Sequence, residues 1–230
     1  MFKKSNVVLL AVCGLVSIPS HAGVYVGLQA DNNRVSGDLT DACSDSQKYY
    51  ERIKKSYSYG VVDCKNDNRS PQMFVGYRFN PIVAIELGYV DFGDVYLSEK
   101  TYDNVNMSNP KPDGYVLYYS EKRSGSGDAT ALSVLLGGDI NESFGLYGRA
   151  GIYHWNVKSQ ISWSYPLKSY KGPSDSAKGD AYGWGVGTVY HIKKFDLFAE
   201  YRRVNNIGDE EETGENDIKT VSLGFRFNFN

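Results

Sequence analysis

The sequence predicts an all-β fold, an eight-stranded antiparallel up-and-down β-barrel that spans a membrane. Three observations lead to this fold class. Apolar side chains recur at every second position in short segments, which is the period of a β-strand. The links between these segments alternate between short and long. The faces opposite the apolar ones carry charged side chains in mid-strand.

The last segment, "KTVSLGFRFNFN" (219–230), shows the alternation most clearly. Its apolar side chains share one face of a strand, and polar side chains or glycine fill the other face. The apolar set is Val221, Leu223, Phe225, Phe227 and Phe229. We therefore expect one face to meet apolar surroundings and the other to meet water.

Seven further segments have a similar strand-like pattern, although the face is less clear in 130–138 and ambiguous in 144–155. In chain order they are residues 23–30, 72–79, 82–92, 130–138, 144–155, 181–190 and 195–203. With the last segment they give eight strands, and an even number is usual in bacterial outer-membrane barrels.

The links define the two ends of the expected barrel. The short links are residues 80–81, 139–143 and 191–194, and the expected long loops are residues 31–71, 93–128, 157–180 and 205–217. Every second link of an up-and-down barrel lies at the same end. The asymmetry is therefore typical of an outer-membrane barrel, which has short periplasmic turns and long extracellular loops.

Charged side chains in mid-strand distinguish this barrel from a soluble one. Arg78, Glu86, Glu200, Arg202 and Arg226 lie on the faces opposite the apolar ones. The alternative, a soluble sandwich or barrel, would bury its apolar faces inside and show polar side chains outside. A dry soluble core does not hold that many charges, whereas a membrane barrel turns apolar side chains to lipid and polar ones to its lumen.

The N-terminus has the pattern of a secretory signal peptide. Two lysines precede an apolar run over 7–18, and small residues stand three and one positions before a cleavage after Ala22. We predict a signal peptide over 1–22 and one outer-membrane barrel domain over 23–230. A lipid anchor on Cys13 is a weaker alternative, because the preceding valine stands where the lipid-attachment motif needs a small residue.

Composition excludes several function classes. The chain has 25 basic and 27 acidic residues and no basic stripe, so we expect no nucleic-acid partner. After cleavage only Cys43 and Cys64 remain, and in an exported chain this pair is expected to form one disulfide. Two thiolates without a nearby histidine do not make a structural zinc site. We expect neither a cofactor nor a metal.

Several stretches resemble the OmpA transmembrane domain family. They are "GYRFNPIVAIELGYVDFGD" (76–94), "LGGDINESFGLYGRAG" (136–151) and "AEYRRVNNIGD" (199–209), followed by "VSLGFRFNF". The resemblance covers most of 23–230 and is absent from the expected long loops. It implies a barrel in the outer membrane of a Gram-negative cell, in contact with outer-membrane lipids and lipopolysaccharide.

The terminal segment also resembles the β-signal read by the outer-membrane assembly machinery, which is then an expected partner. Ser222, Gly224, Phe227 and Phe229 supply its polar residue, glycine and two alternating aromatic residues. Asn230 departs from the aromatic residue that usually ends this signal.

The resemblance has two limits. OmpA proteins proper continue beyond the barrel into a peptidoglycan-binding domain. The barrel domain predicted here extends over 23–230, so we do not expect cell-wall anchoring of this chain. Their luminal gate pairs charges across the bore, and Glu86 matches one gate position. The other gate positions are occupied by uncharged residues, namely Leu135, Phe198 and either Thr188 or Val189. We therefore do not expect a switchable gate of the OmpA kind.

A different luminal set remains. Glu86, Arg149 and Glu200 lie a few residues above their expected turns, and Arg226 lies low in the last strand. We hypothesise that these four form an ion network across the bore. An eight-stranded barrel is just wide enough to be filled by side chains, so such a network would plug it. The alternative is that the charges only solvate the lumen and help to fix strand register.

Catalysis is not expected. His154 is placed near the outer rim and His191 in a periplasmic turn, so neither can position the other as a general base. Asn156 stands two residues after His154, where the lipid A deacylase barrels have a serine. Chemistry at the rim around His154 is the least favoured of the function classes considered.

The long loops are expected to carry any specific role. Tyrosine-rich stretches at 47–60 and 113–123 suit adhesion or partner binding, or they pack extensions of the hairpins. The acidic stretch 208–217 is expected to be a solvated tip, with a divalent-cation site as the alternative. Basic side chains that could meet lipopolysaccharide phosphates are Lys54, Lys55, Lys122 and Arg123.

The sequence thus predicts an outer-membrane barrel with a structural or surface-interaction role, which binds a host or surface ligand at its loops. A small, low-conductance diffusion channel is the alternative.

Overall fold

The computed structural model describes residues 22–53, 58–104, 114–209 and 213–229, which form nine β-strands and one helix. In chain order the elements are β1 (Gly23–Gly37), α1 (Asp38–Ile53), β2 (Ser58–Lys65), β3 (Asp67–Arg78), β4 (Val83–Asn104), β5 (Tyr115–Asp139), β6 (Phe144–Tyr165), β7 (Lys168–Ile192), β8 (Phe195–Ile207) and β9 (Asn216–Asn228). All of the predicted signal peptide except Ala22 lies outside the described ranges.

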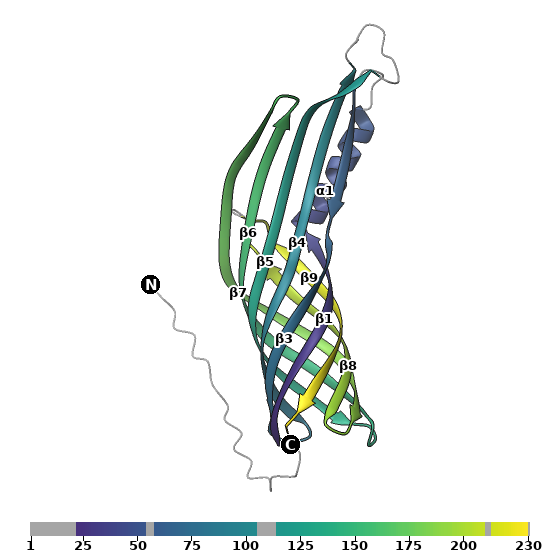
Figure 1. The fold of residues 1–230 in the computed structure, drawn as a ribbon, viewed down its shortest axis with the longest axis vertical. Coiled ribbons are helices and arrows are strands. Elements are labelled where there is room, and N and C mark those ends of the chain that lie inside the picture. Colours follow the sequence, from purple (N-terminus) through teal and green to yellow (C-terminus); the bar gives the residue numbers. More distant parts are fainter. Residues whose placement is uncertain (1–21, 54–57, 105–113, 210–212, 230) are drawn as a thin grey trace, which may run out of the picture.

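Eight of the strands close into one antiparallel barrel (Figure 1). Around the ring the order is β4, β3, β1, β9, β8, β7, β6 and β5, and β5 pairs with β4 to close it. The remaining strand, β2, pairs with the outer part of β4, beyond the stretch that pairs with β3. The predicted eight-stranded up-and-down barrel is therefore confirmed.

Tight turns join β3 to β4, β5 to β6 and β7 to β8 at one end, which we call the turn end (Figure 1). The side-chain oxygen of Asn80 accepts hydrogen bonds from the backbone N–H groups of Ile82 and Val83, at 2.8 and 2.9 Å. Asn141 does the same in the β5–β6 turn. Asparagine stabilises such turns because its side chain mimics a backbone acceptor.

Most of the expected loops at the other end are strands. β4 continues to Asn104, β5 begins at Tyr115, and β6 and β7 are joined by the turn at 166–167. The two hairpins rise beyond the level at which β1, β8 and β9 end (Figure 1). The prediction of loops was wrong because both faces of these strands are partly solvated, so the side chains lack an apolar alternation while the backbone ladder continues.

We call the part of β2 and β4–β7 beyond that level, together with α1, the extension. Helix α1 covers the inner face of its β2–β4 portion: Ser46 hydrogen-bonds Glu99, and the hydroxyl oxygens of Tyr50 and Thr101 lie 3.1 Å apart. A disulfide between Cys43 and Cys64 joins α1 to β2. The expected long loop over 31–71 thus contains a helix that is covalently held against a strand.

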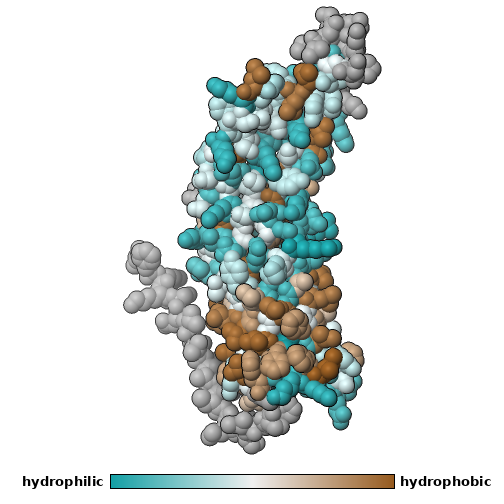
Figure 2. Space-filling view, in the orientation of Figure 1, coloured by the Kyte–Doolittle hydropathy of each residue, from teal (hydrophilic) through white to brown (hydrophobic). Residues whose placement is uncertain are grey.

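The outward face of the barrel is an apolar belt. On β9 it includes Val221, Leu223 and Phe225, and Val24, Val26 and Leu28 continue it on β1. On the face that Figure 2 presents, apolar side chains gather over the lower barrel and hydrophilic ones over the extension. Among the described residues, no helix has the length and apolar character needed to cross a membrane.

Three layers of side chains fill the bore. A lower apolar layer lies nearest the turn end, a charged layer lies above it, and an upper apolar layer closes the barrel below the extension. The lower layer is Tyr25, Phe74, Ala84, Leu135, Tyr147, Val189 and Phe198. The upper layer is Val35, Val90, Phe92, Ala129, Ala131, Tyr153, Trp155, Ala177, Ala181, Val204, Ile207 and Ile218. The expected polar lumen therefore describes only the middle of the bore.

The glycines of β7 make room for the luminal tyrosines. A Cβ at Gly187 would stand 2.4 Å from the ring of Tyr147, and one at Gly183 would stand 2.5 Å from the ring of Tyr153. Glycine in a strand often marks such a close approach. Gly183 and Gly187 are therefore required by the packing of the bore.

We predict that a polymer-tagged maleimide labels the mature protein only after reduction, and then at two sites. The reason is that Cys43 and Cys64 are joined, and that Cys13 leaves with the predicted signal peptide. Band shifts on a denaturing gel, with and without reductant, measure the labelling. Two labels on the unreduced protein would contradict the disulfide, whereas one label before reduction and three after it would show that Cys13 is retained.

Candidate functional site in the bore and at the outer rim

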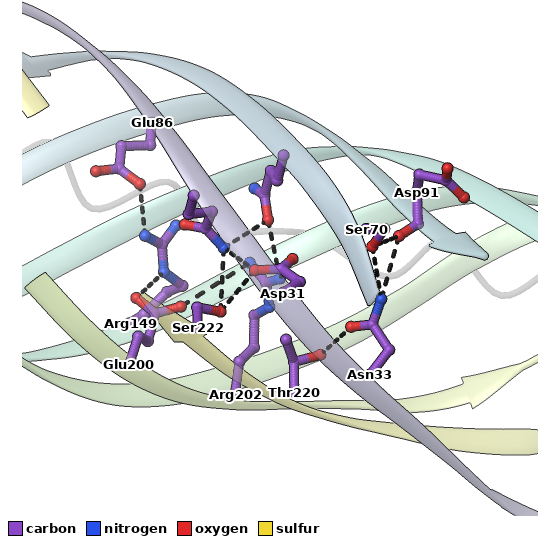
Figure 3. A network of polar contacts seen from close by, with 12 residues as sticks. Asp31, Asn33, Ser70, Glu86, Asp91, Arg149, Glu200, Arg202, Thr220 and Ser222 are labelled. Carbon is purple, nitrogen blue, oxygen red and sulfur yellow. Dashed lines mark hydrogen bonds and ion pairs between the residues drawn. The ribbon is translucent and has the colours of Figure 1, made fainter. Parts of the chain in front are cut away.

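The charged layer begins with an arginine shared by two carboxylates from opposite sides of the barrel (Figure 3). Arg149 on β6 donates from Nη2 to Glu86 Oε2 on β4 at 2.5 Å, and from Nε to Glu200 Oε2 on β8 at 2.8 Å. The hydroxyl of Tyr25 donates to the other oxygen of Glu86 at 2.9 Å. Three strands that are not neighbours are thus tied together across the lumen.

Arg226 lies nearer the turn end than Arg149 and its two carboxylates, and it is held mainly by aromatic rings. Its Nε is 3.8 Å from Glu86 Oε1, which is ion-pair rather than hydrogen-bond distance. Its guanidinium carbon lies 4.7 to 5.6 Å from the ring centroids of Phe198, Tyr147 and Tyr25. Such cation–π contacts partly replace the hydration that a buried guanidinium loses.

A second group of contacts lies above Arg149. Arg202 on β8 donates from Nη2 to Asp31 Oδ2 on β1 at 2.8 Å and to Gln72 Oε1 on β3 at 2.9 Å. Gln29 donates to Gln72 and to Asp31, and Ser222 donates to Asp31 at 2.7 Å. Figure 3 shows the acidic and basic side chains of both groups pointing toward one another.

The charges of this layer balance. It contains three carboxylates and three guanidinium groups, each at most 5% exposed, and we use the name charged layer for these six: Asp31, Glu86, Arg149, Glu200, Arg202 and Arg226. Buried charges are tolerated when they are paired and hydrogen-bonded. Such an arrangement is suited to filling and closing a bore.

The structure brings the four residues of the hypothesised ion network together. Sequence reasoning missed Asp31 as a partner and named Arg202 only as a luminal charge. The alternation of Gln29, Asp31 and Asn33 on the inner face of β1 was the available signal. It lay in a segment assigned mainly to a loop.

The residues of the β-signal resemblance occupy the closing strand. Ser222 is fully buried and faces the charged layer, and Gly224 has no room for a Cβ, which would stand 2.4 Å from the ring of Phe198. Phe227 and Phe229 lie on the other face, with ring centroids 5.1 Å apart.

The two histidines of the described residues, His154 and His191, lie at opposite ends of the barrel. His154 Nδ1 is 2.9 Å from Asp180 Oδ1, its exposed neighbour across the strands at the outer rim. At the turn end, His191 lies between Asp196 and Asp139, at 2.8 and 3.0 Å. Among the described residues, no group of three histidine, cysteine or acidic side chains is placed to hold a metal.

A polar cluster lies on the inner face of the extension. Glu121 accepts hydrogen bonds from Tyr119 and Arg123, both at 2.7 Å. Burial alone would raise the pKa of the Glu121 carboxyl, but these hydrogen bonds outweigh burial and lower that pKa below its usual value. Burial and the same carboxylate raise the pKa of Tyr119.

Several solved barrels resemble this structure over about nine-tenths of the chain. Ail, the attachment invasion locus protein of Yersinia pestis, matches with 15% identity, a TM-score of 0.45, and coverage of 90% of this chain and 99% of Ail. Neisserial surface protein A gives 17%, 0.44, 90% and 97%. The N-terminal β-barrel domain of Pseudomonas aeruginosa OprF gives 16%, 0.40, 90% and 99%. No curated protein sequence matches the chain.

The sequence itself matches a family over nearly its whole length. The match to the OmpA-like transmembrane domain extends over residues 19–230 and so includes every strand of the barrel. With the apolar belt, it places the protein in the outer membrane of a Gram-negative cell, with the turn end toward the periplasm and the extension outside the cell. The chain belongs to the OmpA-like transmembrane domain family.

Proposed function

We propose that this protein is a non-enzymatic surface-interaction barrel with a plugged bore, and that its extension contacts a partner outside the cell. The observation that carries the proposal is the tip of the β6–β7 hairpin. Leu167 in its turn is 97% exposed, and Tyr165 and Tyr170 beside it are also exposed. Apolar and aromatic side chains at a projecting tip are suited to partner contacts, because each offers contact area that water does not stabilise.

The filled bore supports the same proposal over the alternative of a diffusion channel. One apolar layer lies on each side of the charged layer, and the ions of the charged layer contact one another. An eight-stranded barrel has little space beyond its own side chains. The hypothesised ion network is proposed here as a plug.

The outer edge of the apolar belt supports lipopolysaccharide as a membrane partner. Arg34, Lys219 and Arg203 lie side by side on β1, β9 and β8, on the outward faces of these strands, and Arg203 pairs with Asp217. Arg203 follows the outward belt residue Tyr201 by two positions, and Lys219 precedes the belt residue Val221 by two. By contrast, Lys122 lies on the extension, over the ring of Tyr96. Lys54 and Lys55 fall outside the described residues.

We predict that Arg149→Ala opens a leak and lowers stability. The substitution removes the group that Glu86 and Glu200 share, and breaking a buried pair costs roughly 3–5 kcal/mol of unfolding free energy. Planar-bilayer conductance and urea unfolding in micelles measure the two effects. Arg123→Ala is the matched control, because its 58% exposed side chain belongs to an ion pair worth about 0–1 kcal/mol.

Two results would count against the plug. A wide, ohmic pore in the wild-type protein would favour the diffusion channel. If Arg149→Ala has the same stability and conductance as the wild-type protein, the luminal charges act only as solvating groups.

We predict that Leu167→Asp reduces attachment of cells producing the protein to a cultured epithelial monolayer by several-fold. A carboxylate at the tip of the hairpin would make apolar contact with a partner unfavourable. Val61→Asp is the control, because Val61 is an exposed apolar residue on β2, away from the tip. Equal attachment of all three strains, at equal surface amounts of protein, would refute the role of the tip.

We predict that lipid A raises the melting temperature of the micellar protein, and that Arg34→Glu with Lys219→Glu removes most of this increase. The two side chains face each other across β1 and β9 at the outer edge of the belt, where lipid A phosphates lie. Lys100→Glu with Lys122→Glu, on the extension, is the control pair. An increase in melting temperature that survives the first pair of substitutions and not the second would place the contact elsewhere.

Mass spectrometry of lipid A from producing cells would reveal any lipid-modifying activity at the rim.

A further inference from the structure

A blind cavity opens at the outer mouth of the barrel. Its volume is about 330 Å³, at the lower end of the range for small-molecule sites. Phe92, Ile207 and Ile218 at its base belong to the upper apolar layer, which closes the bore below it. Leu39 and Ala42 of α1 line one side. The cavity is therefore open toward the outside of the cell and closed toward the bore.

The sheet wall of the cavity consists of cross-strand rows. Val95 on β4, Gly125 on β5 and Ser159 on β6 are partners in one row, which Asp175 on β7 completes. The next row outward contains Leu97, Arg123 and Ile161. The wall is thus mainly apolar, with small residues in the middle and charged groups at the edge.

Gly125 provides space that the packing of the chain does not require. A Cβ at this position would meet only Val95 Cγ2 at 3.5 Å and the backbone oxygen of Lys158 at 3.7 Å, which are ordinary contacts. This differs from Gly183 and Gly187, whose Cβ atoms would collide with luminal rings. Glycine in mid-strand costs stability, and it often marks a site where another group approaches closely. Within the described ranges, no side chain approaches Gly125 in this way.

The charges at the edge of the cavity are mainly acidic. Arg123 is the single basic side chain among the described residues that line it, and this arginine is already paired with Glu121. Asp38 and Asp175 also line the cavity. The edge therefore disfavours an anionic head group and favours a cationic one.

We propose that this cavity binds a small apolar molecule, of about the size of a bicyclic aromatic ring, that carries a cationic head group. The ring system fills the space over Gly125, where it covers apolar side chains that otherwise face water. The head group lies toward Asp175 at the edge. This site is separate from the charged layer and from the tip of the β6–β7 hairpin.

The test is calorimetric titration of the mature protein, in nanodiscs of zwitterionic lipid, with 1-naphthylmethylamine, after subtraction of empty nanodiscs. We expect saturable binding at one site. Gly125→Leu should weaken binding at least tenfold because its side chain occupies the cavity, and Ala42→Phe should do so from the helix side. Gly138→Leu is the matched control, since a Cβ there meets nothing within 4 Å and lies at the turn end.

The charge preference has its own comparison. 1-Naphthoic acid has the same ring system with an anionic head group, and we expect it to bind at least fivefold more weakly. Asp175→Asn should weaken amine binding by about two- to fivefold, as for loss of an exposed ion pair. Absence of heat beyond that of empty nanodiscs, or full binding by folded Gly125→Leu and Ala42→Phe, would overturn the site. Equal binding of the acid and the amine would overturn the cationic head group.

Discussion

Six ionised side chains share the middle of a bore that is too narrow to hydrate them, and the barrel is arranged around that constraint. Each carboxylate must find its guanidinium on another strand, and Arg149 on β6 reaches both Glu86 on β4 and Glu200 on β8. A slip of one residue would turn a strand's charge toward lipid and its apolar face inward. The same contacts that neutralise the charges therefore also specify the register of the ring.

The two apolar layers make this arrangement effective. They separate the ions from water at both ends, and a lower local dielectric strengthens paired charges and hydrogen bonds while penalising unpaired ones. Arg226 illustrates the boundary between layers, because its guanidinium contacts one carboxylate and three aromatic rings. The tyrosines of the lower layer can reach the centre of the bore only because glycine lies beneath each, Gly76 of β3 under Tyr25 and Gly187 of β7 under Tyr147.

The sequence alone was enough to predict the features that the membrane imposes on the fold. The lipid-facing side chains alternate with period two, so the barrel strands, their number and the tight turns could be read along the chain. The pairing of Asp31 with Arg202 could not, because the stagger between distant strands decides which luminal residues meet. The outer strands were also missed, since a strand with two partly wet faces has no apolar period. Nor does the sequence distinguish Gly125, which leaves space, from Gly183, which packs under Tyr153.

The contrast between barrel and extension follows from where water can reach the backbone. Within the bilayer every backbone group must be paired, so the ring is closed by eight strands. Beyond it β1, β8 and β9 end, and the outer part of β7, before its pairing with β8 begins at Gly183, becomes an edge. That edge carries Lys171, Pro173 and Lys178, residues that oppose pairing with another chain. Because α1 covers the inner face of only β2 and β4, the rest of the inner face stays open, and an apolar cavity forms where the closed and open parts of the wall meet.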